Sequence, residues 1–249
     1  MARKRNFYPG PSTLPLKVLE AIRDQIVDTQ GRGLSMIETS HRGGMYEAVH
    51  NESIELLAEL LGLPKDRKVL FLGGGATLQF AMVPMNLMAK GGSCDYILSG
   101  AWAKKAVADA KRFGTVRLAY DGGPAQFTGL PEASSVRVPA DSAYLHLTSN
   151  ETIGGVQWKS FPQPAGAPLV ADMSSDIMSR RIPAERFGLI YAGAQKNLGP
   201  AGLTVVIIAE QLLQRSPKEL PAYLSYRVHA EENSLYNTPP MVSLEVRCR

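Results

Sequence analysis

Cysteine is scarce in this chain of 249 residues, which contains only Cys94 and Cys248. Two cysteines this far apart indicate neither a disulfide framework nor a thiolate metal site, so we expect a reducing cytoplasm and no bound metal. Long apolar runs are also missing, because no stretch approaches the ~20 apolar residues that a membrane-spanning helix requires. These absences argue against a disulfide-rich secreted protein and against an integral membrane protein.

Charge of one sign is not concentrated along the chain. Basic residues number 27 and acidic residues 23, for a net charge of +4. The one compact basic run, residues 3–5, is too short for a nucleic-acid footprint and is more typical of a solvated terminus. It is followed by NFYPGP at residues 6–11 instead of the apolar stretch of a signal peptide. We therefore expect neither nucleic-acid binding nor export.

The clearest pattern that is present is an alternation of short apolar runs with helical stretches. The length and the 45% hydrophobic composition suit one large domain with its own core. The runs predict strands at 68–72, 96–98, 116–119, 143–147, 168–171, 189–192 and 203–209. The periodic stretches predict helices at 16–28, 46–61, 78–89, 102–113 and 210–215. This alternation predicts an α/β fold with a mainly parallel sheet.

A glycine-rich turn follows the first expected strand. Its sequence is GGGAT at residues 73–77, and a helical pattern comes next. Free N–H groups at a helix N-terminus bind anions, so this turn is a candidate phosphate site to which Thr77 can add a hydroxyl. A plain tight turn explains the glycines equally well. A Walker loop is excluded because no Gly-Lys-Ser/Thr ending is present, and the dinucleotide fingerprint fails at Leu78.

An ionisable residue follows each of two other expected strands. Asp172 follows the run at 168–171, and Lys196 follows the run at 189–192 among small residues. Taken alone, Asp172 is more typical of a turn or helix cap, and Lys196 of a solvated loop. Ligands in open α/β sheets bind at the carboxyl ends of the strands. Together with the glycine turn, an acid and a partly buried amine supply the contacts that pyridoxal 5'-phosphate (PLP) requires.

Further sequence blocks follow one another along the chain. They are NFYPGPSTLP at 6–15, HR at 41–42, GGGAT at 73–77, Trp102, NETIGG at 150–155, DMSS at 172–175, QKN at 195–197 and YNTPP at 236–240. In this order the blocks resemble the phosphoserine aminotransferase family over nearly all of residues 6–240. The resemblance implies the large domain of a fold-type I PLP-dependent transferase, with α/β architecture and a mainly parallel central sheet.

The resemblance also implies roles for individual residues. Lys196 is implied as the covalent anchor of PLP and as the acid/base that moves the substrate Cα proton, and Asp172 as the partner of the ring nitrogen. Further cofactor contacts are implied for Trp102 on the ring face, for Thr152 on the ring hydroxyl, and for Ala76, Thr77 and Gln195 on the phosphate.

Substrate and subunit contacts come from the same resemblance. His41 and Arg42 are implied as residues that bind the substrate anion. Without the resemblance, we would interpret them as part of a surface turn. Asn237 and Thr238 are implied to reach the cofactor phosphate of a neighbouring subunit, which predicts a homodimer with shared sites. The implied reaction transfers an amino group between L-glutamate and 3-phosphohydroxypyruvate, giving O-phospho-L-serine and 2-oxoglutarate. It belongs to serine biosynthesis and, in many bacteria, also to pyridoxine biosynthesis.

The resemblance stops after Pro240. We expect an N-terminal segment at 1–15, a PLP-binding large domain at 16–240, and an aberrant tail at 241–249 where a small C-terminal domain, largely absent here, would begin. Two alternatives stay open: a truncated PLP-binding fragment without catalysis of its own, and another fold-type I enzyme such as a cysteine desulfurase. The second lacks an obvious reactive thiol, because Cys94 precedes an expected strand and Cys248 lies in the tail.

Overall fold

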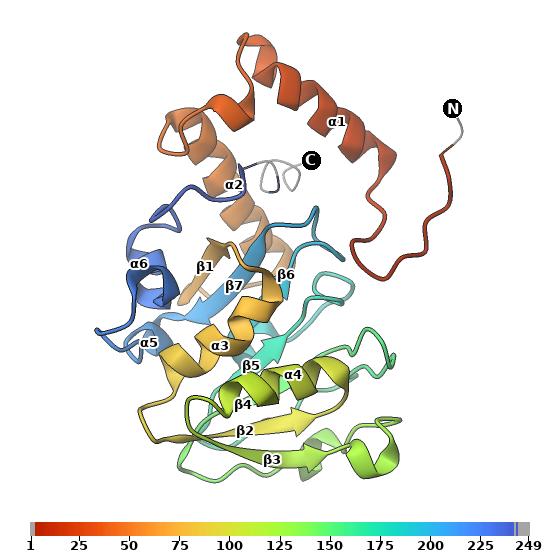
Figure 1. Ribbon diagram of the computed structural model, residues 1–249, viewed down its shortest axis with the longest axis vertical. Coiled ribbons are helices and arrows are strands. Elements are labelled where there is room, and N and C mark those ends of the chain that lie inside the picture. Colours follow the sequence, from red (N-terminus) through yellow and green to blue (C-terminus); the bar gives the residue numbers. More distant parts are fainter. Residues whose placement is uncertain (1–2, 242, 244–249) are drawn as a thin grey trace.

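A seven-stranded sheet forms the centre of the protein in the computed structural model (Figure 1). The structure describes residues 3–241 and 243, so most of the expected tail, including Cys248, lies outside the described residues. The strands are β1 (Arg67–Leu72), β2 (Ser93–Leu98), β3 (Thr115–Asp121), β4 (Ser142–Thr148), β5 (Leu169–Asp172), β6 (Phe187–Gly193) and β7 (Thr204–Ala209). Each coincides, within a few residues, with one of the seven expected runs.

The sheet is mainly parallel, as expected. Its strand order is β1-β7-β6-β5-β4-β2-β3, and only β7 runs antiparallel to its neighbours, which are β1 and β6. Side chains alternate between the two faces, since Val69 and Phe71 of β1 join one apolar cluster while Leu70 and Leu72 join the other. Both faces are therefore covered, which explains the nearly continuous apolar character of the strands.

Helices cover the two faces unequally (Figure 1). Helix α2 (Gly44–Leu61) packs on one face, where it contributes Tyr46 and Leu57 to the core. The helices α3 (Gly75–Leu87), α4 (Ala101–Ala110), α5 (Glu210–Leu213) and α6 (Tyr226–Glu231) contribute to the cluster on the opposite face. Helix α1 (Leu16–Val27) buries no residue and extends away from the sheet. Short 3-10 turns lie at Thr29–Gly31, Met36–Glu38, Gly123–Ala125, Ala133–Ser135, Ala184–Arg186 and Ala222–Leu224.

Two helix boundaries differ from expectation for identifiable reasons. Helix α3 begins three residues earlier than expected, because Gly74 adopts a φ of 85° and caps it in a conformation that other residues rarely take. Helix α6 was not expected, because six residues are too few to establish a periodic pattern. Tyr226 holds α6 in place, since its hydroxyl donates to Gln79 Oε1 at 2.6 Å and its N–H donates to Asn86 Oδ1 at 2.9 Å.

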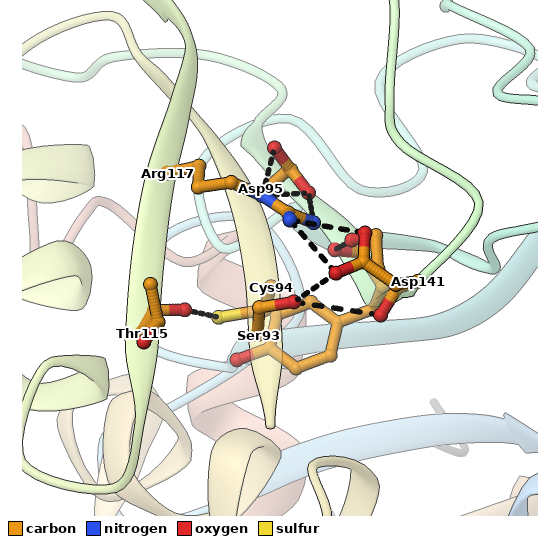
Figure 2. Close-up of polar contacts among 8 residues, drawn as sticks. Ser93, Cys94, Asp95, Thr115, Arg117 and Asp141 are labelled. Atoms are coloured by element: carbon orange, nitrogen blue, oxygen red, sulfur yellow. Dashed lines mark hydrogen bonds and ion pairs between the residues drawn. The ribbon is translucent and has the colours of Figure 1, made fainter. Parts of the chain in front are cut away.

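An ion cluster fastens the edge strand β3 to the sheet (Figure 2). Arg117 of β3 donates to Asp95 of β2 at 2.8 Å and to Asp141, just before β4, at 3.0 Å. Ser93 adds a hydrogen bond to Asp141 at 3.2 Å, and the neighbouring Cys94 is buried. Asp95 is the third residue of β2 and Asp141 precedes β4, so the cluster lies away from the carboxyl ends of these strands, where ligands bind in open α/β sheets. We therefore interpret it as structural.

Candidate functional site

One cavity lies where the carboxyl ends of the parallel strands converge, and we call it the strand-end cavity. Its lining comes from the segments that follow β1, β2, β4, β5 and β6, as the α/β pattern predicts. The lining residues are Gly75, Ala76, Thr77, Phe80, Trp102, Thr148, Asn150, Thr152, Asp172, Ser174, Ser175, Gln195 and Lys196. Seven of the residues selected from sequence are among them: Ala76, Thr77, Trp102, Thr152, Asp172, Gln195 and Lys196.

The N-terminus of α3 forms one side of the strand-end cavity. Helix α3 starts at Gly75, and the first intrahelical bond within it is donated by Leu78 to Gly74. The N–H groups of Gly75, Ala76 and Thr77 therefore have no partner within the helix. These donors and the positive end of the helix dipole favour an anion at this position.

Asp172 ends β5 and presents a buried carboxylate to the cavity. Its side chain is 5% exposed, and Oδ1 accepts hydrogen bonds from the Ser174 N–H at 2.9 Å and the Ser174 hydroxyl at 2.6 Å. Burial raises the pKa of Asp172 to about 6, although the Ser174 bonds and the charge of Lys196 oppose that shift. The site thus holds a carboxylate that a nearby positive charge would stabilise.

Lys196 follows β6 and brings a half-buried amine into the same cavity. Its Nζ donates to Thr152 Oγ1 at 2.5 Å and lies 5.1 Å from the centroid of the Trp102 ring. Burial lowers the pKa of Lys196, while the negative charges of Asp172 and Glu151 act in the opposite direction. A lowered pKa increases the fraction of neutral amine, which is the nucleophilic form.

The N-terminal segment crosses the loop that carries Lys196. Ser12 donates from its N–H to the Gln195 carbonyl at 2.9 Å and from its hydroxyl to the Lys196 carbonyl. The backbone of Gly10 packs against the lysine stem so closely that a Cβ there would lie 2.9 Å from Lys196 Cγ. Sequence reasoning placed this segment outside the large domain and missed its contact with the site.

Glu151 is a buried residue of the site to which sequence reasoning assigned no role. Its carboxylate accepts hydrogen bonds from the N–H groups of Trp102 and Ala103, both at 3.0 Å, and from the Ser99 hydroxyl at 3.2 Å. Glu151 is 1% exposed and acts as the N-terminal cap of α4, although it comes from the loop after β4. No local capping pattern reveals such a contact, because the acceptor lies about fifty residues away in sequence.

Replacement of Glu151 by glutamine is expected to lower the free energy of unfolding by about 1–2 kcal/mol. An amide retains one acceptor oxygen but loses the charge at the helix N-terminus and places N–H groups against a backbone donor. Urea unfolding, followed by tryptophan fluorescence, measures the change. Glu219→Gln, at an exposed position, is the matched control, and an equal effect in both variants would contradict the capping role.

Four residues selected from sequence do not line the strand-end cavity: His41, Arg42, Asn237 and Thr238. Thr238 Oγ1 lies 3.3 Å from His41 Nδ1, so two of the four meet near the surface. Arg42, Asn237 and Thr238 are exposed. Their assigned roles in substrate binding and in a neighbouring subunit remain predictions.

Two buried polar atoms of the cavity lack a hydrogen-bond partner among the described residues. They are Trp102 Nε1 and Thr148 Oγ1. Thr148 was not selected from sequence, but its position at the end of an apolar run is a signal that could have identified it. Within the described part of the chain, no group of three His, Cys, Asp or Glu side chains could hold a metal ion. The two unpartnered atoms favour a polar ligand in the cavity.

Comparison with known proteins identifies the family. The family model for aminotransferase class-V matches residues 5–243. The phosphoserine aminotransferase of Niallia circulans is 51% identical over 238 residues, which cover 96% of this chain and 66% of that protein. The phosphoserine aminotransferase of Geobacillus kaustophilus is 50% identical over 244 residues, which cover 98% of this chain and 68% of that protein.

Solved structures agree with this match. Phosphoserine aminotransferase from Bacillus circulans subsp. alkalophilus superposes with a TM-score of 0.94 at 49% identity, covering 98% of this chain and 68% of that chain. PLP-bound phosphoserine aminotransferase from Trichomonas vaginalis gives a TM-score of 0.88 at 36% identity, covering 99% and 69% of the two chains. The chain spans about two thirds of the length of such relatives. It belongs to the aminotransferase class-V family and is similar, within that family, to phosphoserine aminotransferases.

Proposed function

We propose that the strand-end cavity binds PLP and that the protein transfers an amino group between L-glutamate and 3-phosphohydroxypyruvate. The products are O-phospho-L-serine and 2-oxoglutarate, and the reaction serves serine biosynthesis. The observation that carries this proposal is the meeting of the Lys196 amine, the Asp172 carboxylate and the N-terminus of α3 in one cavity. The match to phosphoserine aminotransferases supports the choice of substrates.

The residues of the cavity fit this cofactor. The first turn of α3, through Ala76 and Thr77, together with Gln195, would hold the phosphate. Asp172 would pair with the ring nitrogen, and the Trp102 ring would pack against the ring face. Thr152 would bond the ring hydroxyl. The unpartnered Trp102 Nε1 and Thr148 Oγ1 show that the cavity still has unused polar groups.

The bound cofactor would supply an electron sink for negative charge that develops on the substrate Cα. The chain supplies the proton chemistry. Once an amino-acid substrate has displaced it from the cofactor, Lys196 Nζ, with its pKa lowered by burial, would accept the substrate Cα proton and deliver it to the cofactor C4′ atom, so one residue would serve as covalent anchor and as acid/base. Thr152 accepts a hydrogen bond from this Nζ and so restricts the position of the amine. Asp172 stabilises positive charge at the far end of the cavity.

A second subunit is part of the proposal. The resemblance to phosphoserine aminotransferases supports this part of the proposal. In the homodimer, Asn237 and Thr238 would reach the neighbouring cofactor phosphate, and His41 and Arg42 would bind the substrate anion. Residues 16–240 form the PLP-binding large domain in this proposal.

The proposal further places the protein in the cytoplasm and gives it an additional role in pyridoxine biosynthesis. Across the described residues, no helix combines the length and apolar composition needed to cross a bilayer.

Cys94 counts against the alternative of a persulfide-forming desulfurase. It lies inside β2 instead of preceding the strand, and burial raises the pKa of its thiol to about 11. Cys248 lies outside the described residues.

Absorbance spectroscopy of the purified chain with PLP tests the proposed function. We expect a new band for lysine-bound cofactor near the blue edge of the visible range, and we expect L-glutamate or O-phospho-L-serine to bleach it. A stable band that ignores both donors would indicate a cofactor-binding chain that does not transaminate by itself. The absence of any band would contradict the PLP assignment.

A further inference from the structure

Ser174 makes more contacts with Asp172 than a turn requires. An N–H two residues after an aspartate commonly bonds its side chain, and Ser174 N–H does so with Asp172 Oδ1 at 2.9 Å. In addition, the Ser174 hydroxyl donates to the same oxygen at 2.6 Å. The second bond depends on the side chain, so the backbone turn alone does not explain it.

The same hydroxyl also links two strands. Ser174 Oγ accepts a hydrogen bond from the N–H of Gly193 at 3.0 Å. Gly193 is the last residue of β6 and precedes Lys196 by three positions, whereas Asp172 is the last residue of β5. One buried hydroxyl thus connects the strand that carries the acid to the strand that leads into the lysine loop.

The contacts with Asp172 are one-sided. Both Ser174 donors bond Oδ1, and no hydrogen bond joins Oδ2 to any other described residue. Asp172 lines the strand-end cavity. The two Ser174 hydrogen bonds fix Oδ1 and set the plane of the carboxylate. Oδ2 is then the oxygen that is available to a ligand.

We propose that Ser174 is a positioning residue, which holds Asp172 in the ionised form and fixes it relative to Lys196 through the bridge to Gly193. The inference rests on the proposed function for its catalytic meaning, because pairing with a cationic ring nitrogen requires an ionised Asp172. A carboxylate that accepts two charge-assisted hydrogen bonds on one oxygen is stabilised over the neutral acid.

Other groups that act on Asp172 are few. From the loop after β6, the Lys196 charge lowers the pKa of Asp172, and from the loop after β4, Glu151 raises it. Tyr191 lies beside Asp172 on β6, and burial raises its pKa far above the usual range. Tyr191 therefore stays neutral near pH 7. Burial is the main opposing effect on Asp172, and the Ser174 bonds are the largest effect that counters it.

The test is a carbon-13 NMR titration of the Asp172 carboxyl in the cofactor-free protein, assigned with Asp172→Asn. In Ser174→Ala we expect the midpoint to move up by about one pH unit, which corresponds to the loss of one hydrogen bond to a charged group. Ser174→Thr keeps the hydroxyl and should titrate near the wild-type midpoint. This readout needs no cofactor, so it separates failure of this inference from failure of the proposed function.

Ser216→Ala is the matched control, because it removes another buried hydroxyl, one that donates to Asn86 Oδ1 at 2.7 Å in a different part of the core. It should leave the Asp172 midpoint unchanged. Should Ser174→Ala not fold, Ser174→Cys, which donates only weakly, takes its place with the same expected direction. A folded Ala or Cys variant with the wild-type midpoint would overturn the proposal.

Discussion

Replacing Lys196 by alanine is expected to abolish covalent retention of PLP. The amine is half-buried, with its pKa lowered by burial, and it lies between Thr152 and the Trp102 ring. These features favour the neutral amine that attacks an aldehyde. After incubation with PLP and reduction with borohydride, intact mass spectrometry should show one adduct on the wild-type chain and none on Lys196→Ala.

Lys105 offers a matched control within the same chain. Its Nζ lies 4.5 Å from the centroid of the same Trp102 ring, but the residue is exposed on α4. Lys105→Ala should therefore carry the adduct as the wild type does. Peptide mapping of the adduct to Lys105, or equal labelling of Lys196→Ala, would refute the role assigned to Lys196.

Asp172→Asn is expected to change the pH dependence of stability in the cofactor-free protein. The pKa of Asp172 is raised from 3.8 to about 6, so the folded state binds a proton more tightly than the unfolded chain. Its favourable contribution is fully present below about pH 4 and is lost as the pH rises through about 6. Relative to Asp172→Asn, the wild type should lose about 3 kcal/mol of unfolding free energy over this interval.

Urea unfolding of both proteins between pH 4 and pH 7 measures this difference. The asparagine amide retains an acceptor for the two Ser174 donors, so the comparison isolates the ionisation. Asp24→Asn, whose side chain is 64% exposed, is the control and should follow the wild-type profile. Parallel curves for the wild type and Asp172→Asn would show that Asp172 does not titrate in this range.

Most of the sheet could be predicted from sequence because β4, β5, β6 and β7 are buried on both faces and are therefore nearly unbroken apolar runs. The edge strand β3 has no buried residue, but its short apolar run was still recognisable. Asp172 and Lys196 were identified because they interrupt this apolar pattern at strand ends, where parallel strands converge. The sequence-based resemblance added Trp102 and Thr152, which carry no signal of their own.

Contacts between distant segments could not be predicted in this way. Glu151 caps a helix from another loop, and the Ser174 hydroxyl reaches a backbone N–H on the next strand. Serine and glutamate are ordinary loop residues, so composition and periodicity do not distinguish these two from the others. The contact of Gly10 with the Lys196 stem likewise depends on a chain path that no local pattern encodes.

The pairing of β1 has a consequence for the order in which the protein folds on the ribosome. Strand β1 leads into the glycine turn, yet in the sheet it is bonded only to β7, with Arg67 opposite Ala209. Strands β2 to β6 can pair with one another before β7 is synthesised. Strand β1 can pair only after β7 has been made, and this pairing closes a long loop at a cost in entropy. The glycine turn at residues 73–77 is thus expected to reach its final position late, after the strands that carry Asp172 and lead to Lys196 have already assembled.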